Sequence, residues 1–227
     1  MNRSLRVMLV AAVAAVSLPV AAQAAPKPGN KPGGGGGGGA PNLKITAAPN
    51  PIVFGSTTKL SGRLTGPNNG GVTVTLRRDE FPYNNTDVKD VATTKTDANG
   101  NYTFTQRPVR NTSYQAVVGT TASKGVIVNV RIRLGLRVDD ATPRVGQLVT
   151  FRGRACPRHD GLVIAIKRRT ATGGFVTVRR ARLKAGDTCS VYARSFRIFR
   201  DGAYRVVADD ADHAKGVSPT RFIDVHR

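Results

Sequence analysis

The chain has 227 residues, with 35 lysines and arginines against 14 aspartates and glutamates, so its formal net charge is +21 at pH 7. A charge of this size indicates association with anionic partners and says nothing about the fold. Tryptophan is absent and aromatic residues make up only 6% of the chain. A sugar-binding platform of flat aromatic rings is therefore disfavoured, and only Phe81 and Tyr83 could serve as one.

Residues 1–24 have the composition of an export signal. A basic start is followed by an apolar run over Val7–Val16 and by small residues at Ala22–Ala24, where cleavage is expected. A retained membrane anchor would need about 20 apolar residues, and Pro19 interrupts the run. We therefore expect a mature chain without a transmembrane segment, secreted or held at the cell surface by binding.

Residues 25–41 form a segment rich in glycine and proline, with seven consecutive glycines at Gly33–Gly39. A phosphate-binding loop would need a strand before these glycines, and a Lys-Ser/Thr pair with a helix after them, which the sequence does not offer. Such a composition cannot bury apolar surface and predicts a disordered tether.

Residues 42–130 alternate apolar and polar side chains in short runs separated by Gly, Pro, Asn and Asp, as expected for strands. The predicted strands of this first domain are 43–47, 57–64, 72–76, 91–96, 102–106, 114–118 and 126–130. Asn99-Gly100 lies between two of them and is a strong hairpin signal, so 91–96 and 102–106 are expected to pair with each other.

Residues 131–227 repeat this plan and form the second predicted domain. The predicted strands are 134–138, 148–155, 162–166, 175–178, 189–198, 204–207 and 221–225. Leu60-Ser61-Gly62-Arg63 recurs as Phe151-Arg152-Gly153-Arg154, 91 positions later, and Gly71–Arg78 recurs as Gly161–Arg168, 90 positions later. The sequence therefore predicts an all-β protein made of two tandem immunoglobulin-like antiparallel β-sandwiches.

The repeated pattern resembles the immunoglobulin-like repeats of secreted bacterial surface proteins. The segment Thr94–Phe104, with Tyr114 after it, is similar to the Cna-B and carboxypeptidase-regulatory (transthyretin-like) modules. The resemblance covers nearly all of residues 42–227 and implies an adhesion or spacer role. Cna-B modules that form isopeptide crosslinks use a core lysine, an asparagine and an acidic residue. No convincing core lysine is present, so no such site is assigned.

Cys156 and Cys189 are the only cysteines, and both lie in the second predicted domain. Cys156 ends its second strand and Cys189 begins its fifth, and these strands are antiparallel neighbours in a sandwich. Exported proteins meet an oxidising environment. We therefore predict a disulfide between them, without a counterpart in the first domain.

Positive charge is concentrated in the second domain, where residues 131–227 carry 21 basic and nine acidic residues. Arginine forks suit phosphate, sulfate and carboxylate groups, so we expect this domain to contact an anionic cell-wall or extracellular polymer. Because exposed aromatics are few, sequence-specific nucleic-acid binding is not expected. The candidate residues are Lys167, Arg168, Arg169, Arg179, Arg180, Arg182, Lys184, Arg194 and Arg197.

An alternative remains open in which the charge is incidental. The chain would then be a structural spacer or a module that binds another surface protein, including one accessory to a separate enzyme. The sequence contains no recognisable catalytic motif, so we expect a monomeric non-enzyme without a cofactor. Three histidines, His159, His213 and His226, lack the spacing of a zinc site, so no metal is expected there. Asp209–Asp212 is a candidate calcium loop or, more simply, a solvated turn.

Overall fold

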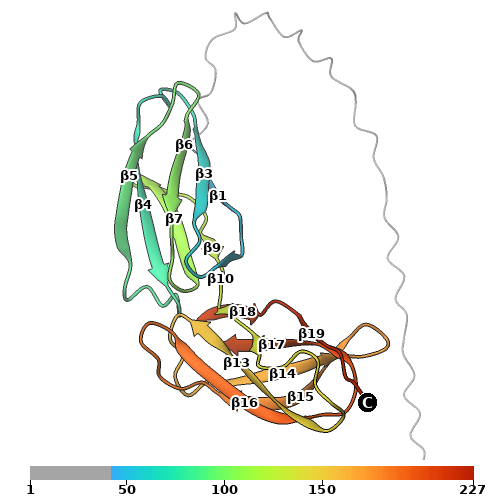
Figure 1. Ribbon diagram of the computed structural model, residues 1–227. Coiled ribbons are helices and arrows are strands. Elements are labelled where there is room, and N and C mark those ends of the chain that lie inside the picture. Colours follow the sequence, from blue (N-terminus) through green and yellow to red (C-terminus); the bar gives the residue numbers. More distant parts are fainter. Residues whose placement is uncertain (1–41) are drawn as a thin grey trace, which may run out of the picture. The chain divides into compact units, whose positions relative to one another are not determined.

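The structure is a computed structural model, and it describes residues 42–227 (Figure 1). The predicted export signal and tether lie outside the described residues. The described chain is all-β, with strands and no helix. The expected fold class is therefore confirmed at this level.

The strands of the first half follow the predicted segments closely. They are β1 (Asn42–Ala48), β2 (Ile52–Val53), β3 (Thr58–Thr65), β4 (Thr73–Glu80), β5 (Lys89–Lys95), β6 (Asn101–Gln106), β7 (Thr112–Val118), β8 (Thr121–Ala122), β9 (Val126–Val128) and β10 (Val130–Arg131). The second half contains β11 (Arg133–Leu134), β12 (Arg137–Val138), β13 (Gln147–Cys156), β14 (Val163–Arg169), β15 (Phe175–Arg182), β16 (Ser190–Ile198), β17 (Gly202–Asp210), β18 (His213–Val217) and β19 (Arg221–Ile223).

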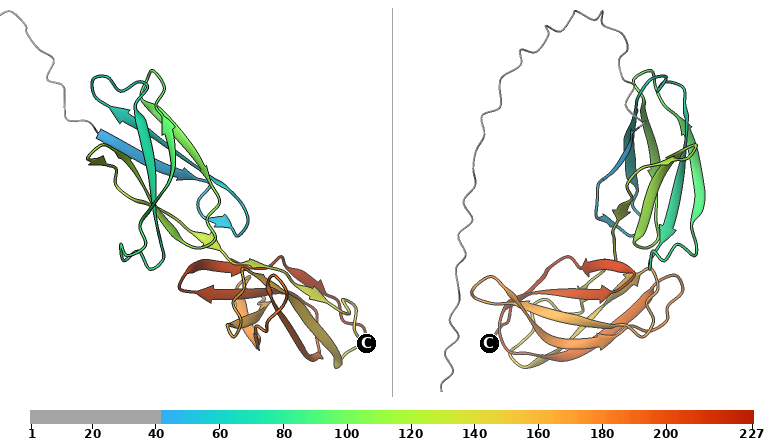
Figure 2. Two further views of the ribbon diagram at one scale, coloured as in Figure 1. Left: turned by 90° about the vertical axis from the view of Figure 1, so that its left-hand side faces the viewer. Right: turned by 180° about the vertical axis from the view of Figure 1, so that it is seen from behind.

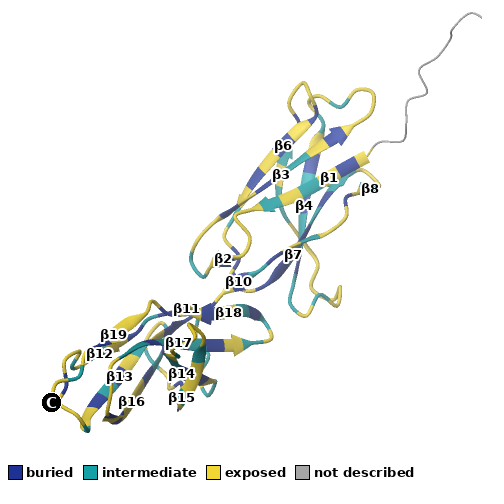
Figure 3. Cartoon of the chain, turned by 90° about the vertical axis from the view of Figure 1, so that its right-hand side faces the viewer, coloured by how far each residue is buried: buried dark blue, intermediate teal, exposed yellow. Residues whose placement is uncertain are grey.

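The first half buries its apolar residues between two sheets. One sheet has the order β1-β3-β6, and the other has the order β5-β4-β7-β8 with β9 also paired to β7. Buried and exposed residues alternate along these strands (Figure 3), as in antiparallel sheets with one face against a core. The buried residues form one cluster, here called the N-terminal core: Leu43, Ile52, Leu60, Leu64, Val74, Leu76, Tyr102, Phe104, Tyr114, Ala116, Val128 and Val130.

The second half has a separate cluster, here called the C-terminal core, formed by 17 buried residues between Ile132 and Ile223. One of its sheets has the order β11-β13-β12 with β16 also paired to β13. The other contains β15-β14-β17-β18, with β19 paired to β17, and continues through β10 to β2. Figure 2 gives two further views of these strands. The two cores share no residue. That residues 42–130 and 131–227 fold as independent domains stays a prediction.

The predicted hairpin between 91–96 and 102–106 is wrong. β5 pairs with β4, whereas β6 pairs with β3 in the other sheet. Both backbone amides of Asn99 and Asn101 donate to Asp97 Oδ1, and Gly100 has a φ of 79°, so the local turn forms as its residues demand. The turn leads the chain from one sheet to the other. An Asn-Gly pair determines the local conformation of the turn, but it does not determine the strands with which the flanking segments pair.

The repeat in the sequence corresponds to a repeated hydrogen bond across each sheet. The Tyr102 hydroxyl donates to the carbonyl oxygen of Lys44 over 2.5 Å, and the Tyr192 hydroxyl donates to that of Gly135 over 2.7 Å. Tyr192 lies 90 positions after Tyr102, and Gly135 lies 91 positions after Lys44. This tyrosine pair was not among the predicted equivalences, although the spacing follows the same repeat.

Each of these tyrosines lies beside a glycine of the neighbouring strand. Gly62 is paired with Tyr102, and Gly153 is paired with Tyr192. A Cβ atom at Gly62 would overlap the Tyr102 ring and the Lys44 carbonyl oxygen, and one at Gly153 would overlap the Gly135 carbonyl oxygen. Glycine is therefore required in both strands by the close approach of a neighbour, and not by a left-handed backbone.

The predicted disulfide between Cys156 and Cys189 is confirmed, with Cα atoms 4.8 Å apart. It follows directly from the register of β13 and β16, in which Ala155 is opposite Ser190. The end of one strand and the residue before the next thus lie side by side. The first half has no cysteine with which to repeat this bond.

A candidate anion-binding groove

The nine basic residues selected from the sequence lie on several surfaces and do not form one face. Arg180 and Arg182 are opposite Ala165 and Val163 in the β14–β15 register. They point to the side of the sheet away from the core, because the alternating Ile164 and Ala181 are buried. By the same alternation Lys167 and Arg169 share this outer side.

Arg168 and Arg179 lie on the core side of the same strands, at the edge of the sandwich. Arg168 is opposite the buried Tyr204, and the Arg179 guanidinium lies 5.3 Å from the centre of the Phe196 ring. Together with Arg197 they line a groove of about 420 Å³. Arg197 also donates to the carbonyl oxygen of Gly146 over 2.8 Å. The eighth residue, Arg194, is exposed on β16, and the ninth, Lys184, belongs to the groove described next.

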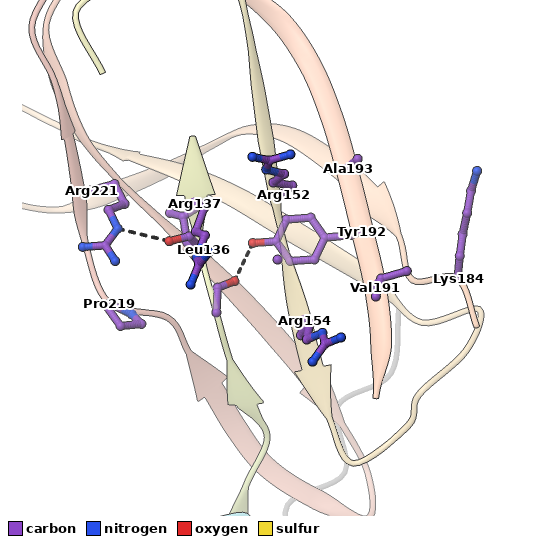
Figure 4. A pocket seen from close by; sticks show the side chains of 12 residues that line it. Leu136, Arg137, Arg152, Arg154, Lys184, Val191, Tyr192, Ala193, Pro219 and Arg221 are labelled. Atoms are coloured by element: carbon purple, nitrogen blue, oxygen red, sulfur yellow. Dashed lines mark hydrogen bonds between the residues drawn. The ribbon is translucent and has the colours of Figure 1, made fainter. Parts of the chain in front are cut away.

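A second grouping of positive charge lies in a larger groove of about 780 Å³ in the second half of the chain (Figure 4). Five of the twelve residues that line it are basic, and none is acidic. We call this the basic groove, and its lining residues are Gly135, Leu136, Arg137, Arg152, Gly153, Arg154, Lys184, Val191, Tyr192, Ala193, Pro219 and Arg221. Of the nine basic residues predicted from the sequence, only Lys184 lines it.

Strand register places three of the arginines together. Arg137 of β12 is directly opposite Arg152 of β13, and Arg154 follows on the same side of β13. Like charges directly opposite each other in a sheet are destabilising. No acidic side chain relieves this repulsion, because within residues 42–227 none of the groove's basic residues forms an ion pair.

The other two basic residues are held by the backbone around the groove. Arg221 donates from Nε to the carbonyl oxygen of Leu136 over 3.1 Å, which directs its guanidinium to the groove wall. Lys184 forms a two-way backbone bridge with Val191, with N–O distances of 2.8 and 2.9 Å. The cationic groups thus come from four separate parts of the chain and are positioned by sheet geometry.

Apart from its basic residues, the lining of the groove is largely apolar. Leu136, Val191, Ala193 and Pro219 line it beside Tyr192. Burial raises the pKa of the Tyr192 hydroxyl above its usual range, so the phenol stays neutral and donates to Gly135. A lining that combines apolar residues with arginines suits a ligand that has anionic groups on an organic backbone, because arginine pairs with carboxylate, sulfate or phosphate in a bidentate manner.

The first copy of the repeat lacks two of these three arginines, because only Arg154 has a basic counterpart there, Arg63. Thr46 is opposite Ser61 in β1 and β3, and these residues lie 91 positions before Arg137 and Arg152. The fold therefore forms without arginines there. The signal that could have revealed the groove is this comparison of the copies, since Arg152 and Arg154 flank a repeated glycine and share one face.

The predicted alternative of an aromatic platform gains no support from the arrangement of its two residues. The Phe81 and Tyr83 rings meet edge to face, with centroids 5.6 Å apart and planes at 85°. Two rings in this geometry do not present one flat surface.

A scan against protein-family models gave no match. No curated protein matched the chain either. Among solved structures, the chain is similar to one described as the "Crystal structure of tetra-tandem repeat in extending region of large adhesion protein", with 15% sequence identity and a TM-score of 0.34. The match covers 82% of this chain and 50% of the other, so the chain spans about half the length of that structure. Within the described residues, no helix is long and apolar enough to cross a membrane.

Proposed function

We propose that the protein is an exported, non-enzymatic binding module that contacts an anionic cell-wall or extracellular polymer through the basic groove. The observation that supports this proposal is that Arg137 and Arg152 lie directly opposite each other in paired strands. Arg154 lies beside them, and no acidic side chain among the described residues pairs with them. The energetic cost of placing these charges together is offset when an anion binds between them.

The chemistry of the groove favours a polymer with repeated anionic groups. Five cationic side chains in a groove of about 780 Å³ can contact several anionic groups at once. The few exposed aromatic residues disfavour base stacking as the main source of affinity. The ligand class is therefore a polymer bearing phosphate, sulfate or carboxylate groups, recognised by charge and spacing.

The test is binding of heparin and of a poly(glycerol phosphate) wall polymer at increasing salt concentration. For nucleic acids, the logarithm of the binding constant falls linearly with the logarithm of the salt concentration, with a slope of about 0.7 to 0.9 per neutralised phosphate. For polymers of similar charge density, five contacts give a loss of affinity of about 100- to 500-fold between 50 and 200 mM salt. A variant with Arg137→Ser, Arg152→Ser and Arg154→Ser keeps two contacts, and its affinity should fall only about 10-fold over that range.

The matched control replaces Arg169, Arg180 and Arg182 by serine. It removes the same charge from the outer side of β14 and β15, where these residues lie outside the groove. Equal losses in both variants would show that net charge alone attracts the polymer and would contradict a role for the groove. Affinity independent of salt and of both variants would instead favour a spacer or a module that binds a surface protein.

A further inference from the structure

His159 and His213 are in direct contact although they lie 54 positions apart in the sequence. Their ring centroids are 4.7 Å apart and the rings are perpendicular. One nitrogen of each ring and one carboxylate oxygen of Asp212 lie within 4.8 Å of one another. No spacing in the sequence indicates this cluster, because its members come from three places: the loop after β13 (His159), the turn after β17 (Asp212) and the first residue of β18 (His213).

The His213 ring faces a hydrogen-bond acceptor on each side. Its Nε2 lies 2.8 Å from the carbonyl oxygen of Val109, which can only accept, so Nε2 carries a proton. Its Nδ1 lies 2.7 Å from Asp212 Oδ1. The His213 side chain is only 2% exposed, so this nitrogen and this carboxylate oxygen are two potential ligand atoms held side by side away from solvent.

The His159 ring, in contact with His213, also has a nitrogen that no protein group uses. Its Nδ1 lies 3.1 Å from Asp210 Oδ2, and its side chain is 7% exposed. Its Nε2 is buried and has no hydrogen-bond partner within the described chain. A buried nitrogen without a partner is costly, and here it carries the lone pair that a metal ion would bind.

We propose that His159, Asp212 and His213 form a binding site for a divalent first-row transition-metal ion such as Zn²⁺. The ligand atoms are Nε2 of His159, Nδ1 of His213 and a carboxylate oxygen of Asp212, and water completes a tetrahedral set. The remaining nitrogen of each ring is held by an oxygen, of Asp210 and of Val109 respectively. Metal-binding histidines usually have this arrangement, with the second nitrogen donating to a carboxylate or a backbone carbonyl.

The distances are compatible with one ion after a small adjustment. Ligand atoms at about 2.0 to 2.2 Å from a tetrahedral zinc ion are about 3.4 Å apart. The ligand atoms of the cluster lie within 4.8 Å of one another, so the two that are farthest apart must move closer. The Asp212 oxygen, 2.7 Å from His213 Nδ1, must move slightly away from it. Two imidazoles select zinc, nickel or copper over calcium and magnesium, which prefer oxygen ligands.

The loop that carries His159 is fixed by features found only in the second copy of the repeat. The Cys156–Cys189 disulfide ties its start to the residue before β16. The backbone amide of His159 donates to Ser190 Oγ over 2.8 Å, and Ser190 donates to Asp160 over 2.5 Å. The loop is thus held in place before any ion arrives, which reduces the entropy lost on binding.

The experiment is calorimetric titration of the untagged, oxidised full-length chain with Zn²⁺, followed by competition with Ca²⁺. We expect one ion per chain and no competition from Ca²⁺. His159→Gln and Asp212→Asn each remove a ligand and should lower the association constant by about 100-fold or more, whereas Asp210→Asn removes only an outer partner and should lower it about 10- to 100-fold. Co²⁺ in place of Zn²⁺ should give a visible absorption band that is lost in His159→Gln.

His226→Ala is the matched control, because His226 is exposed and lies outside the cluster. Its affinity for Zn²⁺ should equal that of the wild type. Asp212, being partly exposed, can be replaced with little risk to folding, so a failure of the His159 variant to fold leaves the test intact. Absence of Zn²⁺ binding, equal binding by Asp212→Asn, or displacement by Ca²⁺ would overturn the proposal.

Discussion

Replacing Cys156 and Cys189 by alanine should destabilise the C-terminal core and leave the N-terminal core unchanged. The disulfide closes a segment with a sequence separation of 33 residues. On the chain-entropy model a loop of this length contributes about 3.7 kcal/mol at 25 °C, because the bond restricts the unfolded chain. For a domain of about 100 residues, each kcal/mol shifts the melting temperature by about 4 °C or more, so the C-terminal transition should fall by about 15 °C.

Differential scanning calorimetry of the wild type and the double variant, with no oxidant or reductant added, measures this fall in the melting temperature directly. Mass spectrometry first establishes that the wild-type bond is intact. The N-terminal core contains neither cysteine, so its transition should be the same in both proteins. If both transitions fell together, the two cores would unfold as one unit, and the prediction of two independent domains would be refuted. A C-terminal transition that did not move would refute the stabilising role of the bond.

Two further predictions concern single side chains. Tyr102→Phe and Tyr192→Phe each remove one hydroxyl-to-carbonyl hydrogen bond, and each should cost about 1 kcal/mol in its own calorimetric transition; a shift in the other transition would contradict the assignment. Hydrogen bonds from Ser190 and Arg158 lower the pKa of Asp160. The ionised Asp160 carboxylate therefore stabilises the fold at pH values above its ordinary pKa of 3.8. This contribution is lost as the pH falls through the lower pKa of the folded state. In urea unfolding, Asp160→Asn should have a lower free energy of unfolding than the wild type near neutral pH, and this difference should vanish in strong acid. A difference that did not change with pH would contradict this role of the Asp160 carboxylate.

Much of the fold could be predicted because it depends on alternation, which each strand carries in its own sequence. The buried Leu60, Val74 and Tyr114 lie where the period of two places them. The disulfide followed from the same reasoning, since the order of the strands brings Cys156 beside Cys189. The pairing of β5 and β6 could not be obtained this way. An Asn-Gly turn is a local signal, whereas the choice of partner strand is made by the burial of both sheets together.

The candidate site was largely hidden for a related reason. Runs such as Arg179-Arg180 are conspicuous along the chain, but successive residues of a strand point to opposite sides. The basic groove instead combines Arg137, Arg152 and Arg221, whose proximity depends on strand register and on Arg221 bonding to Leu136. The contact between His159 and His213 likewise joins a loop and the start of a strand that no sequence spacing links.

The close packing of Tyr102 on Gly62, and of Tyr192 on Gly153, means that the glycine cannot be enlarged while the tyrosine stays, and that the tyrosine can be replaced only by a residue that keeps the ring. A larger residue in place of the glycine displaces the ring, and a smaller residue in place of the tyrosine leaves a backbone carbonyl uncovered above an empty space. The residues at the two positions of each pair are therefore constrained together. A glycine followed by a tyrosine 39 or 40 positions later, between alternating strands, is a fingerprint by which further copies of this module can be sought in chains whose other residues have diverged.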